Sequence, residues 1–361
     1  MNAKNVFILI ATVIALSSPA AAQQRVSGVI ERETRWKAED GPFIVEGDIL
    51  ITRRGNLVIS PGTEIIIAEN AQKLSLTAPF DRVDSTLVSI RVQGGLNWVG
   101  RRDNPITLRP ENQGFTNFTW RGIIIDEADG RHIEIAFTQV SGAATGLTIR
   151  NSNALVRNSA FENCNIGISV QHGGAPRIFN NLITSCFTAG IKVERANPQI
   201  INNIIAFNKN LGLWCDNSSR ITFTYNNVFG NTDRNFLDCD PELGMISLRG
   251  RTNRNTDSTD ASGNIIADPI FTGSPAEARA IEIDINLQTD TSRVKDRRLL
   301  HIPNFQFGPI VFNVPTRIGA ENRQLSGYSP LINAGDPAGR FKNTDGSRNT
   351  IGPSGGPDVW R

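Results

Sequence analysis

Two acidic residues of this sequence recur at the same place in a repeated phrase and could act as an acid–base pair. Glu194 and Asp216 each stand four residues after a glycine, and Lys192 and Trp214 stand two residues after the same two glycines. If the repeats stack as neighbouring strands, about 4.8 Å apart, the two carboxylates are close enough to raise the pKa of one of them. A general acid requires a raised pKa, so Glu194, Asp216 and Lys192 are the candidate catalytic residues.

The same side of the repeats could instead bind a ligand without reacting with it. Trp214 offers a flat aromatic surface on which the apolar face of a sugar ring can stack. Arg150 and Lys192 could hold carboxylate or hydroxyl groups, so Arg150, Lys192 and Trp214 are the candidate ligand-binding residues. A third interpretation involves no ligand, because Lys192 and Glu194 also suit an ordinary solvated charge pair of small energetic consequence.

A repeat of about 22 residues places these side chains. In each repeat a glycine is followed by a stretch whose first and third residues are apolar or cysteine, which is typical of a strand with one buried face. The glycines are Gly122, Gly146, Gly167, Gly190 and Gly212. The phasing predicts that Leu147, Ile168, Ile191 and Leu213 stack in one interior column.

A second register, made of asparagines, runs through the same repeats. Its members are Asn158, Asn180–Asn181, Asn202–Asn203 and Asn226–Asn227. Asparagine tolerates the left-handed backbone of a sharp turn, and its amide can hydrogen-bond to an asparagine stacked above it. With about three short strands per repeat and no helical pattern, the period predicts an all-β fold, a right-handed parallel β-helix that climbs one strand spacing per coil.

Residues 133–231 resemble the parallel β-helix repeat region of many exported bacterial proteins, a shape shared with pectate-lyase-like enzymes. Residues 41–65, which end in a Pro-Gly turn, resemble the opening of such proteins. "NIIADPIF" (264–271), "YSPLINAGDP" (328–337) and "DGSRNTIGPSGGP" (345–357) resemble their closing segments. The resemblance implies the fold and not an activity, because this fold hosts lyases, hydrolases, adhesins and proteins without any known reaction.

We therefore expect an N-terminal cap with the first coils at residues 23–70, β-helix repeats at 71–245 and a C-terminal extension of closing segments at 246–361. An insert at 272–327 separates the "ADPIF" and "SPLINAGDP" elements. In the family that the chain resembles, these two elements usually lie close together. We interpret the insert as a decorated loop that caps the end of the helix, in preference to a separate binding domain.

The first residues indicate export. Residues 1–22 contain one lysine, an apolar run and three final alanines, the form of a secretory signal peptide, and no later stretch is apolar enough to span a membrane. We expect a periplasmic or extracellular protein of undetermined oligomeric state. Without the signal peptide the chain has 36 basic and 35 acidic residues, which gives no electrostatic case for binding nucleic acid.

The four cysteines permit a specific pairing. Cys164 and Cys186 lie 22 residues apart, just before their respective glycines, so they should stack in adjacent coils. The coil spacing lies within the Cα separation that a disulfide permits, and we predict a disulfide between Cys164 and Cys186. Cys215 occupies a core position equivalent to Val193 and is interpreted first as a buried thiol, with pairing to Cys239 as the alternative.

Signals for a metal or for a known enzyme are weak. "NTDGS" (343–347) has the oxygen-bearing side chains and glycine of a small calcium loop, with Asn343 and Asp345 as ligands, although a tight Asx turn explains it as well. No other cofactor is predicted. The aspartate clusters of pectate-lyase-like and polygalacturonase-like sites do not appear.

We therefore expect an exported β-helix protein that binds polysaccharide, or another surface partner, through the outward face of one parallel sheet. A polysaccharide lyase or glycoside hydrolase with an unfamiliar active site is one alternative, and a structural surface protein is the other.

Overall fold

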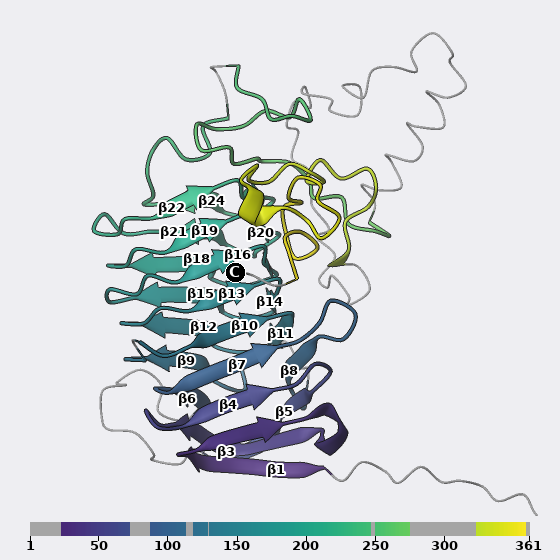
Figure 1. Ribbon diagram of the computed structural model, residues 1–361. Helices are drawn as coiled ribbons and strands as arrows, with labels where there is room; N and C mark the ends of the chain where they lie inside the picture. The colour runs from purple at the N-terminus through teal and green to yellow at the C-terminus, as the bar shows by residue number, and fades with distance from the viewer. Residues whose placement is uncertain are drawn as a thin grey trace, which may run out of the picture.

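The computed structural model describes residues 23–72, 87–112, 118–128, 130–246, 250–274 and 323–358. In these residues the chain winds into stacked coils of short parallel strands with almost no helix (Figure 1). The 3-10 helices η1 (Ala38–Asp40) and η4 (Gly339–Phe341) have one turn each. The predicted all-β, parallel β-solenoid architecture is confirmed.

Two of the predicted segments fall largely outside these residues. They are the signal peptide at 1–22 and most of the insert, residues 275–322. Across the described parts of the chain, no helix is both long enough and apolar enough to cross a membrane.

Three ribbons of strands run along the solenoid. The first ribbon is formed by β6 (Ser89–Val92), β9 (Gly122–Asp126), β12 (Thr145–Arg150), β15 (Ile166–Gln171), β18 (Ala189–Glu194), β21 (Leu211–Trp214) and β24 (Arg234–Leu237). The second ribbon is formed by β2 (Glu33–Trp36), β4 (Asn56–Ile59), β7 (Gly95–Val99), β10 (Ile133–Ala136), β13 (Leu155–Arg157), β16 (Arg177–Phe179), β19 (Gln199–Ile201) and β22 (Thr222–Thr224). The third ribbon is formed by β5 (Glu64–Gln72), β8 (Ile106–Pro110), β11 (Thr138–Ser141), β14 (Ala160–Glu162), β17 (Leu182–Thr184), β20 (Ile204–Ala206) and β23 (Asn227–Phe229).

The N-terminal end is built from two longer strands, β1 (Gln24–Ile30) and β3 (Phe43–Ile51), which pair with each other. β3 also pairs with β5 and with β6, so it joins the third and first ribbons into one 16-stranded sheet. The second ribbon is a separate 8-stranded sheet. The interior between the ribbons is filled by apolar side chains.

The predicted interior column is present. Leu147 pairs with Ile168, Ile168 with Ile191, and Ile191 with Leu213, and all four side chains are fully buried. The repeat phasing is therefore confirmed. Because side chains alternate along a strand, the residues between these positions belong to the outer side of the first ribbon.

The asparagines make the corners between the second and third ribbons. Asn158, Asn180 and Asn202 have positive φ values of 49°, 55° and 61°, the left-handed conformation that asparagine accepts more readily than most residues. Tyr225 takes the same conformation, with φ of 54°, in the next coil. The predicted turn role is confirmed for Asn158, Asn180 and Asn202, whereas in the next coil Tyr225 holds the turn and the predicted register is off by one residue.

A second set of asparagines, one residue further along, forms a buried ladder through the coils. The Nδ2 atom of Asn181 donates to Oδ1 of Asn203 at 3.0 Å, and Nδ2 of Asn203 donates to Oδ1 of Asn226 at 3.0 Å. The ladder continues from Asn226 to Asn264 at 3.2 Å. The predicted hydrogen bonding between stacked amides is confirmed.

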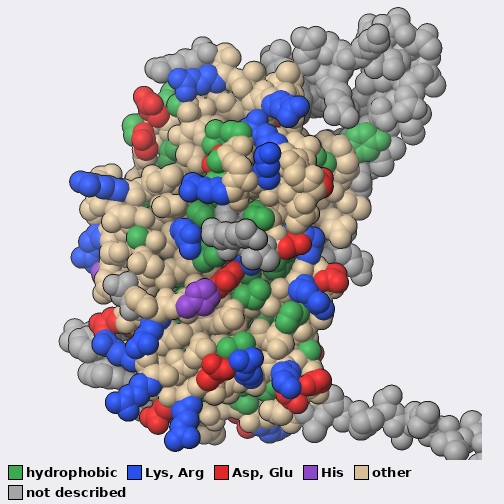
Figure 2. Space-filling view, in the orientation of Figure 1, with side chains coloured by type: hydrophobic (Ala, Val, Ile, Leu, Met, Phe, Trp, Pro, Cys, Tyr) green, Lys and Arg blue, Asp and Glu red, His purple; other side chains and the backbone are tan. Residues whose placement is uncertain are grey.

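The C-terminal residues 323–358 pack along the side of the coils (Figure 1, yellow). Phe341 is fully buried and meets the ring of Phe179 edge-on, with 5.3 Å between ring centroids. Ile351 packs in a second apolar cluster with Ile204 of the third ribbon. The chain thus covers apolar residues on the outside of its own coils. Figure 2 shows this side of the molecule, with basic side chains beside the C-terminal segment.

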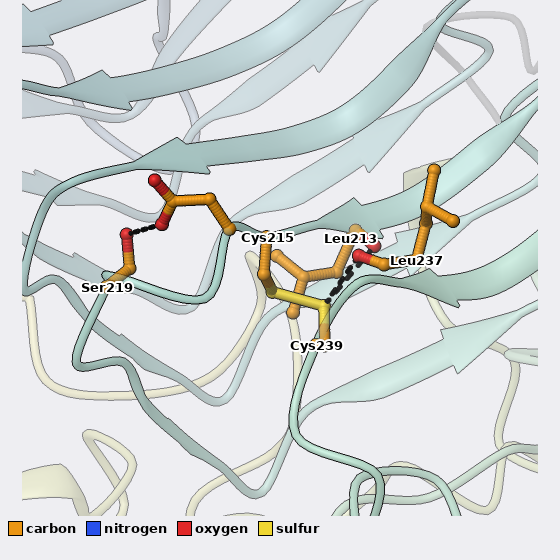
Figure 3. Close-up of a disulfide and its surroundings, with 6 residues drawn as sticks. Leu213, Cys215, Ser219, Leu237 and Cys239 are labelled. Atoms are coloured by element: carbon orange, nitrogen blue, oxygen red, sulfur yellow. Dashed lines mark hydrogen bonds between the residues drawn. A yellow bond between two sulfur atoms is a disulfide. The ribbon is translucent and has the colours of Figure 1, made fainter.

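The cysteines pair differently from the prediction. The disulfide joins Cys215 to Cys239, whose Cα atoms lie 4.9 Å apart (Figure 3). Cys164 and Cys186 are free and buried. The predicted Cys164–Cys186 disulfide is therefore wrong, and the alternative pairing of Cys215 is the one formed.

The reason lies in the column that the free thiols occupy. The N–H of Cys186 donates to Oδ1 of Asn208 at 3.0 Å, so cysteine and asparagine take equivalent inward positions in successive coils. The thiols lie against backbone carbonyls of their own coils, with Sγ of Cys164 3.4 Å from the Glu162 oxygen and Sγ of Cys186 3.5 Å from the Thr184 oxygen. Burial raises the pKa of Cys164 to about 12 and also raises that of Cys186, which makes both thiols unreactive.

The two paired cysteines each follow shortly after a strand of the first ribbon. Cys215 comes directly after β21, and Cys239 follows β24 by one intervening residue, Asp238, which has a φ of 56°. Trp214 pairs with Leu237, so the residue matched to Cys215 in register is Asp238, and Cys239 lies one residue beyond it. Glu162 pairs with Thr184, so the free thiols Cys164 and Cys186 hold equivalent positions instead.

We expect the denatured, unreduced protein to react with a thiol reagent at Cys164 and Cys186 only, as read by peptide mass spectrometry. Cys215→Ser should lower the free energy of unfolding by about 3 kcal/mol, because it releases a loop closed across 24 residues. Cys186→Ala is the control for loss of a sulfur without loss of a disulfide. Labelling of all four cysteines before reduction would contradict this pairing.

Candidate functional site

Three of the predicted residues meet on the outer side of the first ribbon. Lys192 on β18 is paired in register with Trp214 on β21. Its Nζ atom lies 2.9 Å from Oε1 of Glu194 and 4.2 Å from the centroid of the Trp214 ring. The side chain of Glu194 is 39% exposed and that of Lys192 only 18%, so the carboxylate is the more accessible group. The lysine is held between a carboxylate and an aromatic face.

A polar chain continues this cluster toward the earlier coils. The Nε atom of Arg150 on β12 donates to Oε1 of Gln171 at 3.2 Å, and Nε2 of Gln171 donates to Oγ of Ser169 at 2.8 Å. In register, Gln171 adjoins Glu194 and Ser169 adjoins Lys192. We call the outward residues of these strands the strand face. They are Arg150, Ser169, Gln171, Lys192, Glu194 and Trp214.

Asp216 does not belong to the strand face. β21 ends at Trp214, and Asp216 lies in the following turn, where its carboxylate accepts bonds from the Arg195 N–H at 2.9 Å, the Ser218 hydroxyl at 2.8 Å and the Ser219 hydroxyl. Burial acts to raise the pKa of Asp216, but these hydrogen bonds outweigh it and lower the pKa below its ordinary value of 3.8. A general acid needs the opposite shift, so this geometry does not favour Asp216 as a catalytic acid.

In the candidate calcium loop, the side chains of Asn343 and Asp345 are hydrogen-bonded to nearby residues of the C-terminal segment. The side-chain amide of Asn343 donates to Ser347 Oγ at 2.9 Å, and its Oδ1 atom accepts the N–H of Thr350 at 3.1 Å. Asp345 accepts the Ser347 N–H at 2.8 Å, and bonds from Ser347 lower the pKa of Asp345. These contacts fit the Asx-turn interpretation. In the described part of the chain, no three His, Cys, Asp or Glu side chains gather as metal ligands.

The family model described as "Right handed beta helix region" matches residues 111–266. These residues include the coils in which parallel pairing and the interior column were observed. This chain is a right-handed parallel β-helix protein.

Solved structures similar to this β-helix include two crystal structures of the periplasmic alginate epimerase AlgG, a single mutant and a double mutant. The first is 16% identical with a TM-score of 0.32, and the match covers 58% of this chain and 62% of that one. The second is 15% identical with a TM-score of 0.28, covering 65% and 66%. The match thus spans less than two thirds of either epimerase structure. With such low identities and TM-scores, it assigns neither a substrate nor a reaction to this chain. A comparison with curated proteins gives no match.

The β-helix also has a groove that the sequence did not indicate. It has a volume of about 500 Å³ and lies between the corners of three coils and the C-terminal segment. Arg101 and Arg102, on the turn after β7, line it together with Arg323 of the C-terminal segment. No spacing rule connects positions 102 and 323, which only the docking of the C-terminal segment brings together.

Proposed function

We propose that this β-helix binds a polysaccharide on its strand face and does not cleave it. The observation that carries the proposal is the cluster of Lys192, Glu194 and Trp214, which sets an aromatic ring, a cation and an accessible carboxylate on adjacent strands of a parallel ribbon. Strands hold such groups more rigidly than loops do. An aromatic ring beside polar groups suits the mixed apolar and hydroxyl surface of a sugar.

Binding is favoured over catalysis by the state of the two carboxylates. Glycoside hydrolysis normally uses a pair of carboxyl groups, one of them with a raised pKa. Asp216 is engaged in its turn and has a lowered pKa, and Glu194 is bound to Lys192 at 2.9 Å. The strand face therefore offers hydrogen-bonding groups to a ligand more readily than it offers an acid and a base.

The proposal places the protein outside the cytoplasm. The Cys215–Cys239 disulfide supports this placement, because disulfides form and persist mainly in oxidising compartments. It agrees with the signal peptide expected at residues 1–22.

The test is a panel of purified polysaccharides, measured for binding by calorimetry and for new reducing or unsaturated ends. We expect the parent to bind at least one polymer without producing new ends, and Trp214→Ala and Lys192→Ala each to weaken binding about tenfold, since each removes roughly 1.4 kcal/mol of contact. Arg177→Ala is the matched control, because Arg177 is an exposed strand residue on the second ribbon.

Equal binding by the parent and both strand-face variants would show that the strand face is not the binding site. Product formation by the parent that Glu194→Gln abolishes would establish the hydrolase or lyase alternative. Absence of binding across the whole panel would favour the structural alternative.

A further inference from the structure

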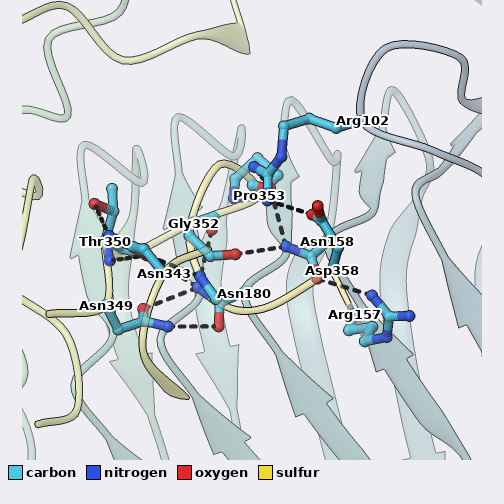
Figure 4. A network of polar contacts seen from close by, with 12 residues as sticks. Arg102, Arg157, Asn158, Asn180, Asn343, Asn349, Thr350, Gly352, Pro353 and Asp358 are labelled. Carbon is cyan, nitrogen blue, oxygen red and sulfur yellow. Dashed lines mark hydrogen bonds and ion pairs between the residues drawn. The ribbon is translucent and has the colours of Figure 1, made fainter. Parts of the chain in front are cut away.

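The N-terminal end of the solenoid has a free sheet edge. β1 ends the 16-stranded sheet there (Figure 1), and among the described strands it pairs with β3 alone. At the opposite end, Asn227 of β23 pairs with Ile265 of the following chain. The corners of the later coils are covered too, since Nδ2 of Asn180 donates to the carbonyl oxygens of Thr350 at 2.9 Å and Gly352 at 3.0 Å (Figure 4). The described chain supplies partners at these places but not along the outer edge of β1.

The hydrogen bonds of β1 show which of its backbone groups face this edge. The N–H of Gln24 donates at 3.1 Å to the residue before β3, and the carbonyl oxygen of Ile30 accepts at 3.0 Å from the residue after β3. Both residues therefore direct their backbone groups toward β3. Because these directions alternate along a strand, Arg25 and Val29 direct their N–H and C=O groups away from β3. Such open groups on an edge strand readily pair with another chain.

The side chains of β1 add apolar surface to the edge. Val29 is 48% exposed and is one of only two exposed large hydrophobic side chains in the described residues. Val26 and Ile30 pack against the end of the interior cluster and are only partly buried. The strand, QRVSGVI, contains neither the lysine nor the proline that often protects an edge from pairing. A partner strand would bury apolar surface as well as satisfy the backbone.

A second copy of β1 complements this edge. In an antiparallel pair centred on Ser27, Arg25 of each copy lies opposite Val29 of the other, and the backbone groups that face the edge meet in hydrogen-bonded pairs. The exposed side chains of Arg25 and Val29 then share one side of the pair, so the arginine stem covers the valine. Glu31, which is exposed and directly follows β1, lies diagonally across from Arg25 of the other copy. Backbone, apolar surface and charge are thus all self-complementary.

We propose that two copies of this protein join at their N-terminal ends, with the two β1 strands paired antiparallel about a two-fold axis at Ser27. Both copies use the same edge, so the contact closes on itself and gives a dimer and not a fibre. It also joins the two 16-stranded sheets into one. The residues of the strand face lie in later coils, from Arg150 to Trp214, and stay outside this interface. The dimer therefore does not depend on the polysaccharide site proposed above.

The first test measures the oligomeric state of the full chain, purified after export, by sedimentation equilibrium over a range of concentrations. Val29→Lys sets a cation opposite Arg25 of the second copy and should weaken the dimer at least tenfold, whereas Val29→Glu sets an anion there and should keep or tighten it. Both changes replace the same exposed valine by a long charged side chain, so they disturb the protomer alike. Gln199→Lys is the matched control, because Gln199 is an exposed residue of β19, which is paired on both sides, and it should leave the dimer unchanged.

The second test checks the register by crosslinking. Ser27→Cys sets two thiols opposite each other at the two-fold axis, within the Cα separation that a disulfide permits, so mild oxidation should give a covalent dimer on a non-reducing gel. Arg25→Cys is the control, since its two thiols would lie roughly 13 Å apart along the strands and should not crosslink. Circular dichroism checks that each variant keeps the fold.

Three outcomes would each overturn the proposal. The first is a parent protein that stays monomeric at every concentration, which would leave the edge to a strand of another protein. The second is equal dimerisation of Val29→Lys and Val29→Glu, which would place the contact on another surface. The third is equal crosslinking by Ser27→Cys and Arg25→Cys, which would show that the two strands do not pair about Ser27.

Discussion

Replacing Asn203 with alanine is expected to lower the free energy of unfolding by about 3–5 kcal/mol. The Oδ1 atom of Asn203 accepts the N–H of Asn181 at 2.9 Å, and its Nδ2 atom donates to the carbonyl oxygens of Ile178 at 2.8 Å and Ile201 at 3.1 Å. The side chain is fully buried, so no water can replace these partners. Each buried polar group left without a partner costs about 1–3 kcal/mol, and the substitution leaves more than one such group without a partner.

The measurement is urea-induced unfolding together with amide hydrogen exchange in the coils on either side. Asn217→Ala is the matched control, because Asn217 is exposed in the turn after β21, and it should change stability by less than about 0.5 kcal/mol. Exchange should accelerate most at Asn181, whose N–H loses its acceptor. A change below about 1 kcal/mol in Asn203→Ala would show that the asparagine ladder contributes little to the solenoid.

The second large effect is expected from Phe341→Ala, which should release the C-terminal segment from the coils. Phe341 is fully buried and packs against Leu155, Phe179 and Ile201 of the second ribbon. Truncation of a buried phenylalanine to alanine typically costs about 3–5 kcal/mol. Because the coils have their own core, this loss should fall mainly on the attachment of residues 323–358.

Limited proteolysis with mass spectrometry is the direct measurement. We expect rapid cleavage within 323–358 in Phe341→Ala while the coils stay resistant. Phe341→Leu, which keeps most of the buried apolar volume, should show a smaller effect. Phe341→Ala should also lose the groove, because the released segment carries Arg323 and Pro353, which line it. Unchanged protease resistance would mean that the polar contacts of Asn180 hold the segment without Phe341.

The sequence by itself determined the solenoid, because every coil repeats the same local solution. A glycine, alternating apolar residues and an asparagine corner recur at one period, so residues one period apart must occupy equivalent places. This is why the column from Leu147 to Leu213 and the asparagine contacts were predictable. Lys192 and Trp214 met as expected for the same reason, since both lie inside strands that pair in register.

The tertiary structure decided whatever departs from the repeat. Asp216 lies two residues after the end of β21, where the chain has left the strand register. Its contacts are therefore determined by the nearby Ser218 hydroxyl and the Arg195 N–H. The cysteine pairing depended on side-chain direction, which spacing does not reveal, because stacked positions can hold side chains that run parallel. The groove required Arg101 and Arg323, which are far apart in sequence, to meet in its lining. No local pattern encodes that meeting, since it results from the burial of Phe341 and Ile351 against the outside of the coils.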